Sequence, residues 1–199
     1  MTLRRRVGWR RGILLLAGAA LLVFSMVRAL SGEPEIALMI GEPWEAMRQR
    51  SSAVIDPVIP GHFWFACRSS DERVRCIDPQ LEFETPLARV FTVIFHRDGL
   101  VSSVRMSPQI EPLLLDDTLK VLLDLQEQWR QGGWTPIRLN DFPSFADTPQ
   151  WRARLRDVNI GGTAYWRADN KYQVMLGVNR FRDDKRPTEE RYLITLQLA

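Results

Sequence analysis

Few residues of this sequence have types and spacings that could do chemistry. The sequence has only two histidines, His62 and His96, so it cannot form a histidine-rich metal site. It has no Gly-Xaa-Ser-Xaa-Gly motif to place a serine nucleophile on a sharp strand-to-helix turn. Gly161-Gly162 lacks the lysine and the strand-before-helix order of a phosphate-binding loop. We therefore predict no catalytic residues, no bound metal and no cofactor.

Neighbouring carboxylates are the remaining candidates for acid–base chemistry. They are Glu82 with Glu84, Asp116-Asp117, Asp183-Asp184 and Glu189-Glu190. A glycosidase needs two carboxyl groups at a defined separation across a cleft. The first pair precedes a proline turn, the second begins a helix and the last two lie in a charged loop, so turns and a helix cap explain them. An enzyme that acts through carboxylates is therefore the alternative rather than the main prediction.

The N-terminal segment predicts the compartment of everything that follows it. A predominantly apolar run, Gly12–Leu30, comes after five arginines with no acidic residue among them, Arg4, Arg5, Arg6, Arg10 and Arg11. Positive charge before such a run holds the N-terminus in the cytoplasm. We therefore predict a cytoplasmic basic tail plus signal-anchor or signal peptide over residues 1–34, and a single periplasmic domain over residues 35–199.

Residues 12–30 could either stay in the inner membrane or be cleaved. The uncharged run of sixteen residues, Gly12–Val27, spans about 24 Å as a helix, which is short of the roughly 30 Å hydrocarbon core. Arg28 can reach the far interface with its long side chain, so Ala29 and Leu30 can complete a span. A single-pass anchor in the inner membrane and a soluble periplasmic domain after cleavage therefore both remain open.

The distribution of charge gives no support for a nucleic-acid partner. The whole sequence has 27 basic and 24 acidic residues, but residues 1–34 hold six arginines and one glutamate. Residues 35–199 therefore carry 21 basic and 23 acidic side chains, a net charge of −2. The basic side chains are nearly all arginine, which is typical of GC-rich bacteria, and a periplasmic domain implies a Gram-negative one. We predict no binding to nucleic acid.

The two cysteines, Cys67 and Cys76, flank a polar stretch between two short apolar segments. A two-residue turn at Asp71-Glu72 would place them directly opposite each other in a hairpin. An even number of cysteines in an exported chain indicates a disulfide. Closing a loop of about ten residues would stabilise the fold by roughly 2.7 kcal/mol in the chain-entropy model. We predict a Cys67–Cys76 disulfide.

The remaining pattern predicts an α+β domain. The helix signals are a proline start at 41–43, a long amphipathic run over about 117–131, and a threonine cap with proline at 148–149. Apolar alternation predicts strands over residues 36–40, 62–68, 74–77, 89–96, 100–106, 163–168, 171–181 and 191–198. We predict an antiparallel β-sheet in two meander halves, which allow a loose tandem repeat. The sheet would pack against two or three helices and follow one N-terminal hydrophobic helix.

Two predicted hairpins decide which side chains face solvent. A two-residue turn at Asp98-Gly99 would give the pairs Phe95–Ser102, Val93–Val104 and Phe91–Met106. A two-residue turn at Asp169-Asn170 would give the pairs Val174–Tyr165 and Leu176–Thr163. These registers predict one outward-facing set: Thr92, His96, Ser103, Arg105, Trp166, Gln173 and Met175. The opposite parity of the second hairpin, with Trp166 in the core, remains the alternative.

We predict a non-enzymatic protein that binds another protein through this outward-facing set. Six tryptophans lie beyond residue 34, and tryptophan and arginine are enriched at the hot spots of protein interfaces. The partner would be a toxin that acts in the envelope, which would make this chain an inhibitor or immunity protein, or a component of an envelope assembly. The alternatives are an envelope enzyme acting on peptidoglycan or lipid through carboxylates, and a lipid- or glycan-binding module that uses exposed tryptophans.

Overall fold

A computed structural model describes residues 33–57, 64–67, 72–78 and 82–199, and for residues 64–67 it describes the backbone alone. The chain divides between Glu33 and Pro34, and the unit Pro34–Ala199 is described by itself. None of the described helices combines the length and the apolar character that a membrane span requires. The predicted hydrophobic helix over residues 12–30 lies outside the described residues, so the membrane anchor stays a prediction. His62 also lies outside them.

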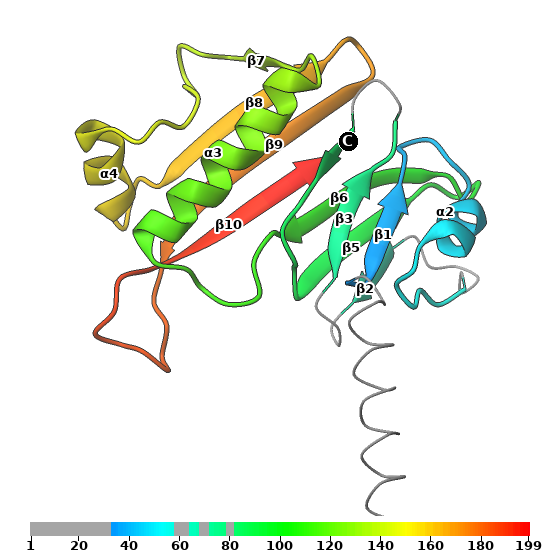
Figure 1. The fold of residues 1–199 in the computed structure, drawn as a ribbon, viewed down its shortest axis with the longest axis horizontal. Helices are drawn as coiled ribbons and strands as arrows, with labels where there is room; N and C mark the ends of the chain where they lie inside the picture. The colour runs from blue at the N-terminus through cyan, green and yellow to red at the C-terminus, as the bar shows by residue number, and fades with distance from the viewer. Residues whose placement is uncertain (1–32, 58–63, 68–71, 79–81) are drawn as a thin grey trace, which may run out of the picture. The chain divides into compact units, whose positions relative to one another are not determined.

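Two β-sheets form this unit (Figure 1). The larger sheet is antiparallel throughout and has seven strands in the order β2 (Trp64–Cys67), β5 (Val90–Phe95), β6 (Val101–Ser107), β10 (Arg191–Leu198), β9 (Tyr172–Phe181), β8 (Gly162–Ala168) and β7 (Thr135–Ile137). The smaller sheet has three strands, β1 (Glu35–Leu38), β3 (Arg73–Cys76) and β4 (Phe83–Glu84), and its β1–β3 pair is parallel. The predicted α+β class with a mostly antiparallel sheet is confirmed. Strands β4 and β7 and the parallel pair were not predicted.

In the described residues three helices accompany the sheets: α2 (Trp44–Arg50), α3 (Leu115–Gln131) and α4 (Pro149–Arg156). Helix α4 begins as predicted, because the Thr148 hydroxyl accepts a hydrogen bond from the Trp151 N–H at 3.3 Å and Pro149 occupies the first turn. Helix α3 begins two residues before the predicted start, after Leu114, which makes no side-chain cap. Its first turn carries two aspartates, which the helix dipole favours there.

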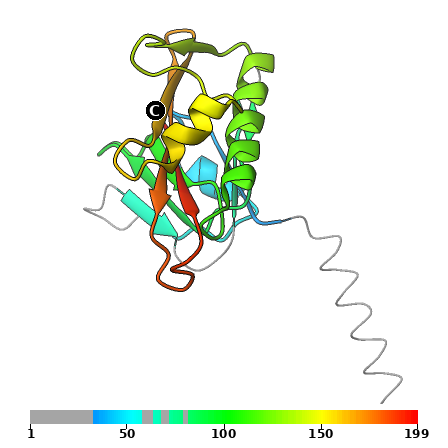
Figure 2. The same cartoon turned by 90° about the vertical axis from the view of Figure 1, so that its left-hand side faces the viewer.

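The core lies on one face of the seven-stranded sheet, and two different layers cover that face. Helix α3 covers the half made by β8, β9 and β10, where Leu119, Leu122 and Trp129 are at most 2% exposed. The three-stranded sheet covers the half made by β5 and β6, where it buries Leu38 and Val74 (Figures 1 and 2). Burying large apolar side chains from both layers supplies most of the driving force for folding.

The predicted hairpin between the two cysteine strands is wrong. Strand β2 belongs to the large sheet, where Cys67 lies opposite Phe91, whereas β3 belongs to the small sheet, where Cys76 lies between Leu38 and Phe83. Strand β2 pairs with β5, and strand β3 pairs with β1 and β4, so the two strands that carry the cysteines are not neighbours. Cys76 is fully buried, and burial raises the pKa of its thiol. The Cys67 side chain lies outside the described ones, so the disulfide stays a prediction.

Candidate functional site

One face of the seven-stranded sheet points away from α3 and the small sheet, and we call it the outer face. Because side chains alternate along a strand, the registers assign to it the side chains opposite in direction to the buried ones. They are Val90, Thr92, Ile94, Ser103, Arg105, Ser107, Thr135, Ile137, Thr163, Tyr165, Arg167, Gln173, Met175, Gly177, Asn179, Phe181, Arg191, Leu193, Thr195 and Gln197. All of them are half-buried or exposed except Ser103 and Gly177. Figure 2 shows α3 on the other side of the sheet.

The first hairpin confirms two of its three predicted pairs, Val93–Val104 and Phe91–Met106, while Phe95 pairs with Val101 rather than Ser102. Its loop has three residues instead of two: the His96 N–H donates to the Leu100 oxygen at 2.8 Å, and Gly99 takes a φ of +79°. The extra loop residue shifts the pairing by one position. The register shift between Ile94 and Phe95 then shifts it back, so the predicted face is correct for most of the strand.

The outward residues predicted from this hairpin have different exposures. Thr92 and Arg105 lie directly opposite each other on the outer face, half-buried and exposed respectively. His96 is exposed beside the turn, at the end of the sheet. Ser103 lies on the predicted face but is only 7% exposed, so it offers little surface to a partner.

The second hairpin is wrong by one residue, and this moves Trp166 into the core. Its loop also has three residues, since Ala168 pairs with Tyr172 and the Lys171 N–H donates to the Ala168 oxygen at 3.2 Å. No bulge compensates here, so Trp166 pairs with Val174 and the predicted Val174–Tyr165 pair does not form. A one-residue slip exchanges the two faces of a strand.

Trp166 is therefore removed from the candidate interface. It is 1% exposed and lies 5.8 Å from Trp129 between ring centroids, with the Arg130 guanidinium 5.6 Å from its ring centroid. Gln173 and Met175 keep their predicted place on the outer face, exposed and half-buried respectively.

Tyr165 lies on the outer face, where the sequence predicted the next residue, Trp166. It lies directly opposite Ile137 on β7 and Met175 on β9. The Arg138 guanidinium sits 5.3 Å from the tyrosine ring centroid, and the Phe142 ring packs edge-on at 5.0 Å. We call these five residues the Tyr165 cluster. Sequence reasoning missed it, although alternation along β8 does separate two larger residues, Tyr165 and Arg167, from the small Ala164 and Ala168.

The outer face has positive charge and no negative charge. None of its residues is aspartate or glutamate, while Arg105 and Arg167 are exposed on it and Arg138 lies against Tyr165. Arg191, at the start of β10, is ion-paired with Glu189. Within the described part of the chain Arg105, Arg138 and Arg167 form no ion pair. Their charges are therefore available to a group outside this domain.

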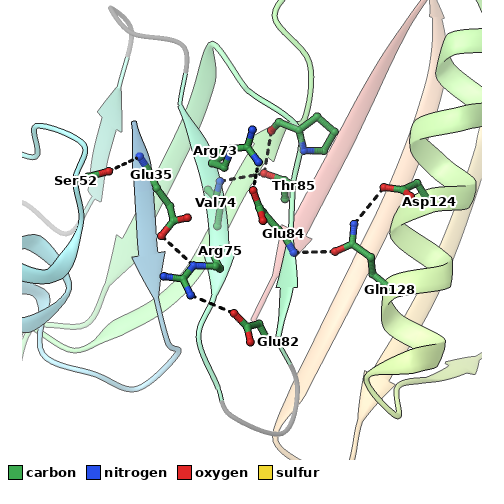
Figure 3. A network of polar contacts seen from close by, with 11 residues as sticks. Glu35, Ser52, Arg73, Val74, Arg75, Glu82, Glu84, Thr85, Asp124 and Gln128 are labelled. Carbon is green, nitrogen blue, oxygen red and sulfur yellow. Dashed lines mark hydrogen bonds and ion pairs between the residues drawn. The ribbon is translucent and has the colours of Figure 1, made fainter. Parts of the chain in front are cut away.

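The solvent side of the three-stranded sheet has the opposite arrangement, which Figure 3 shows. Arg75 donates to Glu35 at 2.9 Å and to Glu82 at 3.1 Å, and both contacts raise its pKa. Arg73 is ion-paired with Glu84. We call this set the paired cluster.

A hollow of about 450 Å³ lies beside the paired cluster. Its lining is polar and includes Glu82, Glu84 and Gln128, whose amide oxygen accepts a hydrogen bond from the Glu84 N–H at 2.9 Å. Glu84 is ion-paired with Arg73, and Glu82 with Arg75. The alternative of an enzyme that acts through carboxylates stays a prediction.

No protein-family model, curated protein or solved structure matches this chain. Among the described residues, no group of three or more histidine, cysteine, aspartate or glutamate side chains could hold a metal ion. The outer face is suited instead to non-covalent contact, because it is broad and combines half-buried apolar side chains with hydroxyls, amides and free arginines.

Proposed function

We propose that this protein is a non-enzymatic module of the cell envelope that binds another protein through its outer face. The observation that carries the proposal is the Tyr165 cluster, in which tyrosine, phenylalanine and arginine meet on an open sheet face. Tyrosine and arginine are enriched at interface hot spots, where a few central side chains supply most of the binding energy. Half-buried Met175 and Ile137 add apolar area beside them.

The surroundings of the Tyr165 cluster resemble the rim of a protein interface in composition. Gln197 on β10 and Thr92 on β5 lie along the same cross-strand row as Tyr165, two and four strands away, and Thr195 on β10 lies in the next row. Interfaces of ordinary affinity combine a central apolar and aromatic patch with a polar rim that stays accessible to water. The protein therefore offers a partner both parts of such an interface on one rigid sheet.

The lipid- or glycan-binding alternative depended on exposed tryptophans. Among the described side chains, Trp44, Trp129, Trp134 and Trp166 are each at most 2% exposed and Trp151 is half-buried, so none of these five supports it. These side chains stabilise the core. The envelope location itself depends on the predicted anchor or signal over residues 12–30. Within it we propose an inhibitor or immunity role or an assembly role.

Photo-cross-linking in cells that make the protein naturally tests the proposal. We would place p-benzoylphenylalanine at Thr195, near the middle of the outer face, and at Lys120, an exposed position of α3, as the matched control. We expect a discrete protein adduct from position 195 and none from position 120. No adduct from position 195, or the same adducts from both positions, would overturn the proposal.

A further inference from the structure

We infer that the partner presents an acidic protein surface to the outer face, with carboxylates that pair with Arg105 and Arg167 and apolar side chains that pack between them. This inference rests on the proposed function and adds the chemistry of the partner to it. The basis is the distribution of charge in this domain: most described arginines lie beside a carboxylate, whereas Arg105 and Arg167 do not.

Elsewhere on the described surface most arginines are ion-paired, with Arg97, Arg154 and Arg180 as exceptions. Arg152 donates to Asp147 at 2.5 Å and to Asp116 at 2.6 Å, and Arg186 to Glu111 at 2.6 Å. The domain has a small excess of acidic residues, 23 against 21 basic ones over residues 35–199. None of those carboxylates lies on the outer face, so Arg105 and Arg167 have no acidic side chain on their own face to pair with.

The positions of the free arginines indicate a broad ligand. Arg105 is on β6 and Arg167 is on β8, with β10 and β9 between them. At about 4.8 Å per strand, three spacings separate them by roughly 14 Å across the sheet. A single small anion cannot contact both side chains. A protein surface or an extended segment can, and half-buried Met175 between the two arginines and Tyr165 beside Arg167 would contact its apolar side chains.

The density of charge favours a protein over other polyanions. A nucleic-acid site needs several lysines or arginines along the path of the phosphates, and a site for anionic lipid needs a cluster of four or more. The outer face has isolated arginines separated by threonine, glutamine and methionine side chains. Covering those arginines without a carboxylate would leave charges desolvated and unpaired, so a bound protein must supply acidic groups.

The first test compares charge variants in the cross-linking experiment with the photo-reactive residue at position 195. The double variant Arg105→Glu/Arg167→Glu should lower the adduct yield at least tenfold, whereas the matched reversal Lys120→Glu on α3 should leave it unchanged. Thermal unfolding of each variant confirms that the fold is intact. An adduct that keeps its yield in the double variant would overturn the acidic partner but keep the proposed function, whereas no adduct in the parent protein contradicts the function itself.

The second test uses defined polymers and needs no partner. Poly-L-glutamate titrated into the 15N-labelled protein should shift the Nε–H resonances of Arg105 and Arg167, and poly-L-lysine should not. Polyuridylate and phosphatidylglycerol vesicles represent the other polyanions. Stronger shifts with either of them than with poly-L-glutamate, or shifts with poly-L-glutamate that spare both arginines, would overturn the inference.

Discussion

Two solvent-facing sheet surfaces of this protein carry arginines, and the arginines differ in whether they pair with carboxylates of the same domain. On the small sheet, each arginine of the paired cluster meets glutamates of its own domain: Arg73 with Glu84, and Arg75 with Glu35 and Glu82. On the outer face of the large sheet, Arg105 and Arg167 meet none among the described residues. Arg73 and Arg75 are half-buried, whereas Arg105 and Arg167 are exposed. The comparison indicates that an exposed arginine without a nearby carboxylate is the better candidate.

The largest predicted difference in the free energy of unfolding is between substitutions on the two sides of the large sheet. Trp166→Ala should lower the free energy of unfolding by about 3–5 kcal/mol, because it removes a fully buried indole that packs on Trp129. Tyr165→Ala, one residue away on the outer face, should cost about 1 kcal/mol or less, as most surface changes do. Urea unfolding of both variants measures this difference. Equal costs would mean that the register of β8 is not the one described.

The paired cluster should make a small contribution to stability. Arg75→Met removes contacts to two glutamates while keeping most of the aliphatic stem, and we expect a loss of about 0.5–1 kcal/mol because the ion pairs are partly exposed. The same substitution at Arg105 is the matched control and should change stability by less than about 0.5 kcal/mol. Urea unfolding compares the two. A larger loss at Arg105 would show that this arginine has a structural partner.

How far the sequence predicted these surfaces depends on two turns. Both hairpins have a three-residue loop where Asp-Gly and Asp-Asn suggested two residues. In the first, Gly99 takes the positive φ that its loop needs and the β-bulge near Ile94 restores the predicted pairing, so alternation alone gave the correct face. In the second nothing compensates, and Asp169 itself takes a φ of +49°. The turn residues alone do not predict a bulge further along the hairpin, because a bulge depends on how the whole strand pairs with its neighbours.

The class of fold was predictable for a different reason than the site. Long alternating segments such as 171–181 and 191–198, and the Thr148-Pro149 cap, are local signals, and each element formed close to its predicted bounds. The parallel β1–β3 pair joins segments about 38 residues apart, Glu35 with Arg73, and no local pattern encodes it. The same is true of Arg138 over Tyr165, which depends on β7 pairing with β8.

Paired carboxylates should also give this protein a small dependence of stability on pH that the carboxylate-free outer face cannot contribute. In α2, the hydrogen bond from Arg48 holds the pKa of Glu45 at about 2, below the ordinary value of 4.5. Because the folded-state pKa is the lower one, the stabilisation is present above about pH 4.5 and is lost as pH falls toward 2. Thermal unfolding of the parent and of Glu45→Gln between pH 2 and 6 should show the parent losing its advantage as pH falls. A constant difference would contradict the pairing.

The effect of Tyr165→Ala on the adduct formed at position 195 tests the central claim most directly. Truncating a central anchor of an interface ordinarily costs about 2 kcal/mol or more of binding, which corresponds to roughly thirtyfold in affinity. We expect the adduct yield to fall at least tenfold while the thermal midpoint stays within a few degrees of the parent, and Lys120→Ala to change neither. An adduct that forms with parent yield in the folded Tyr165→Ala variant would show that the Tyr165 cluster is not the centre of the interface.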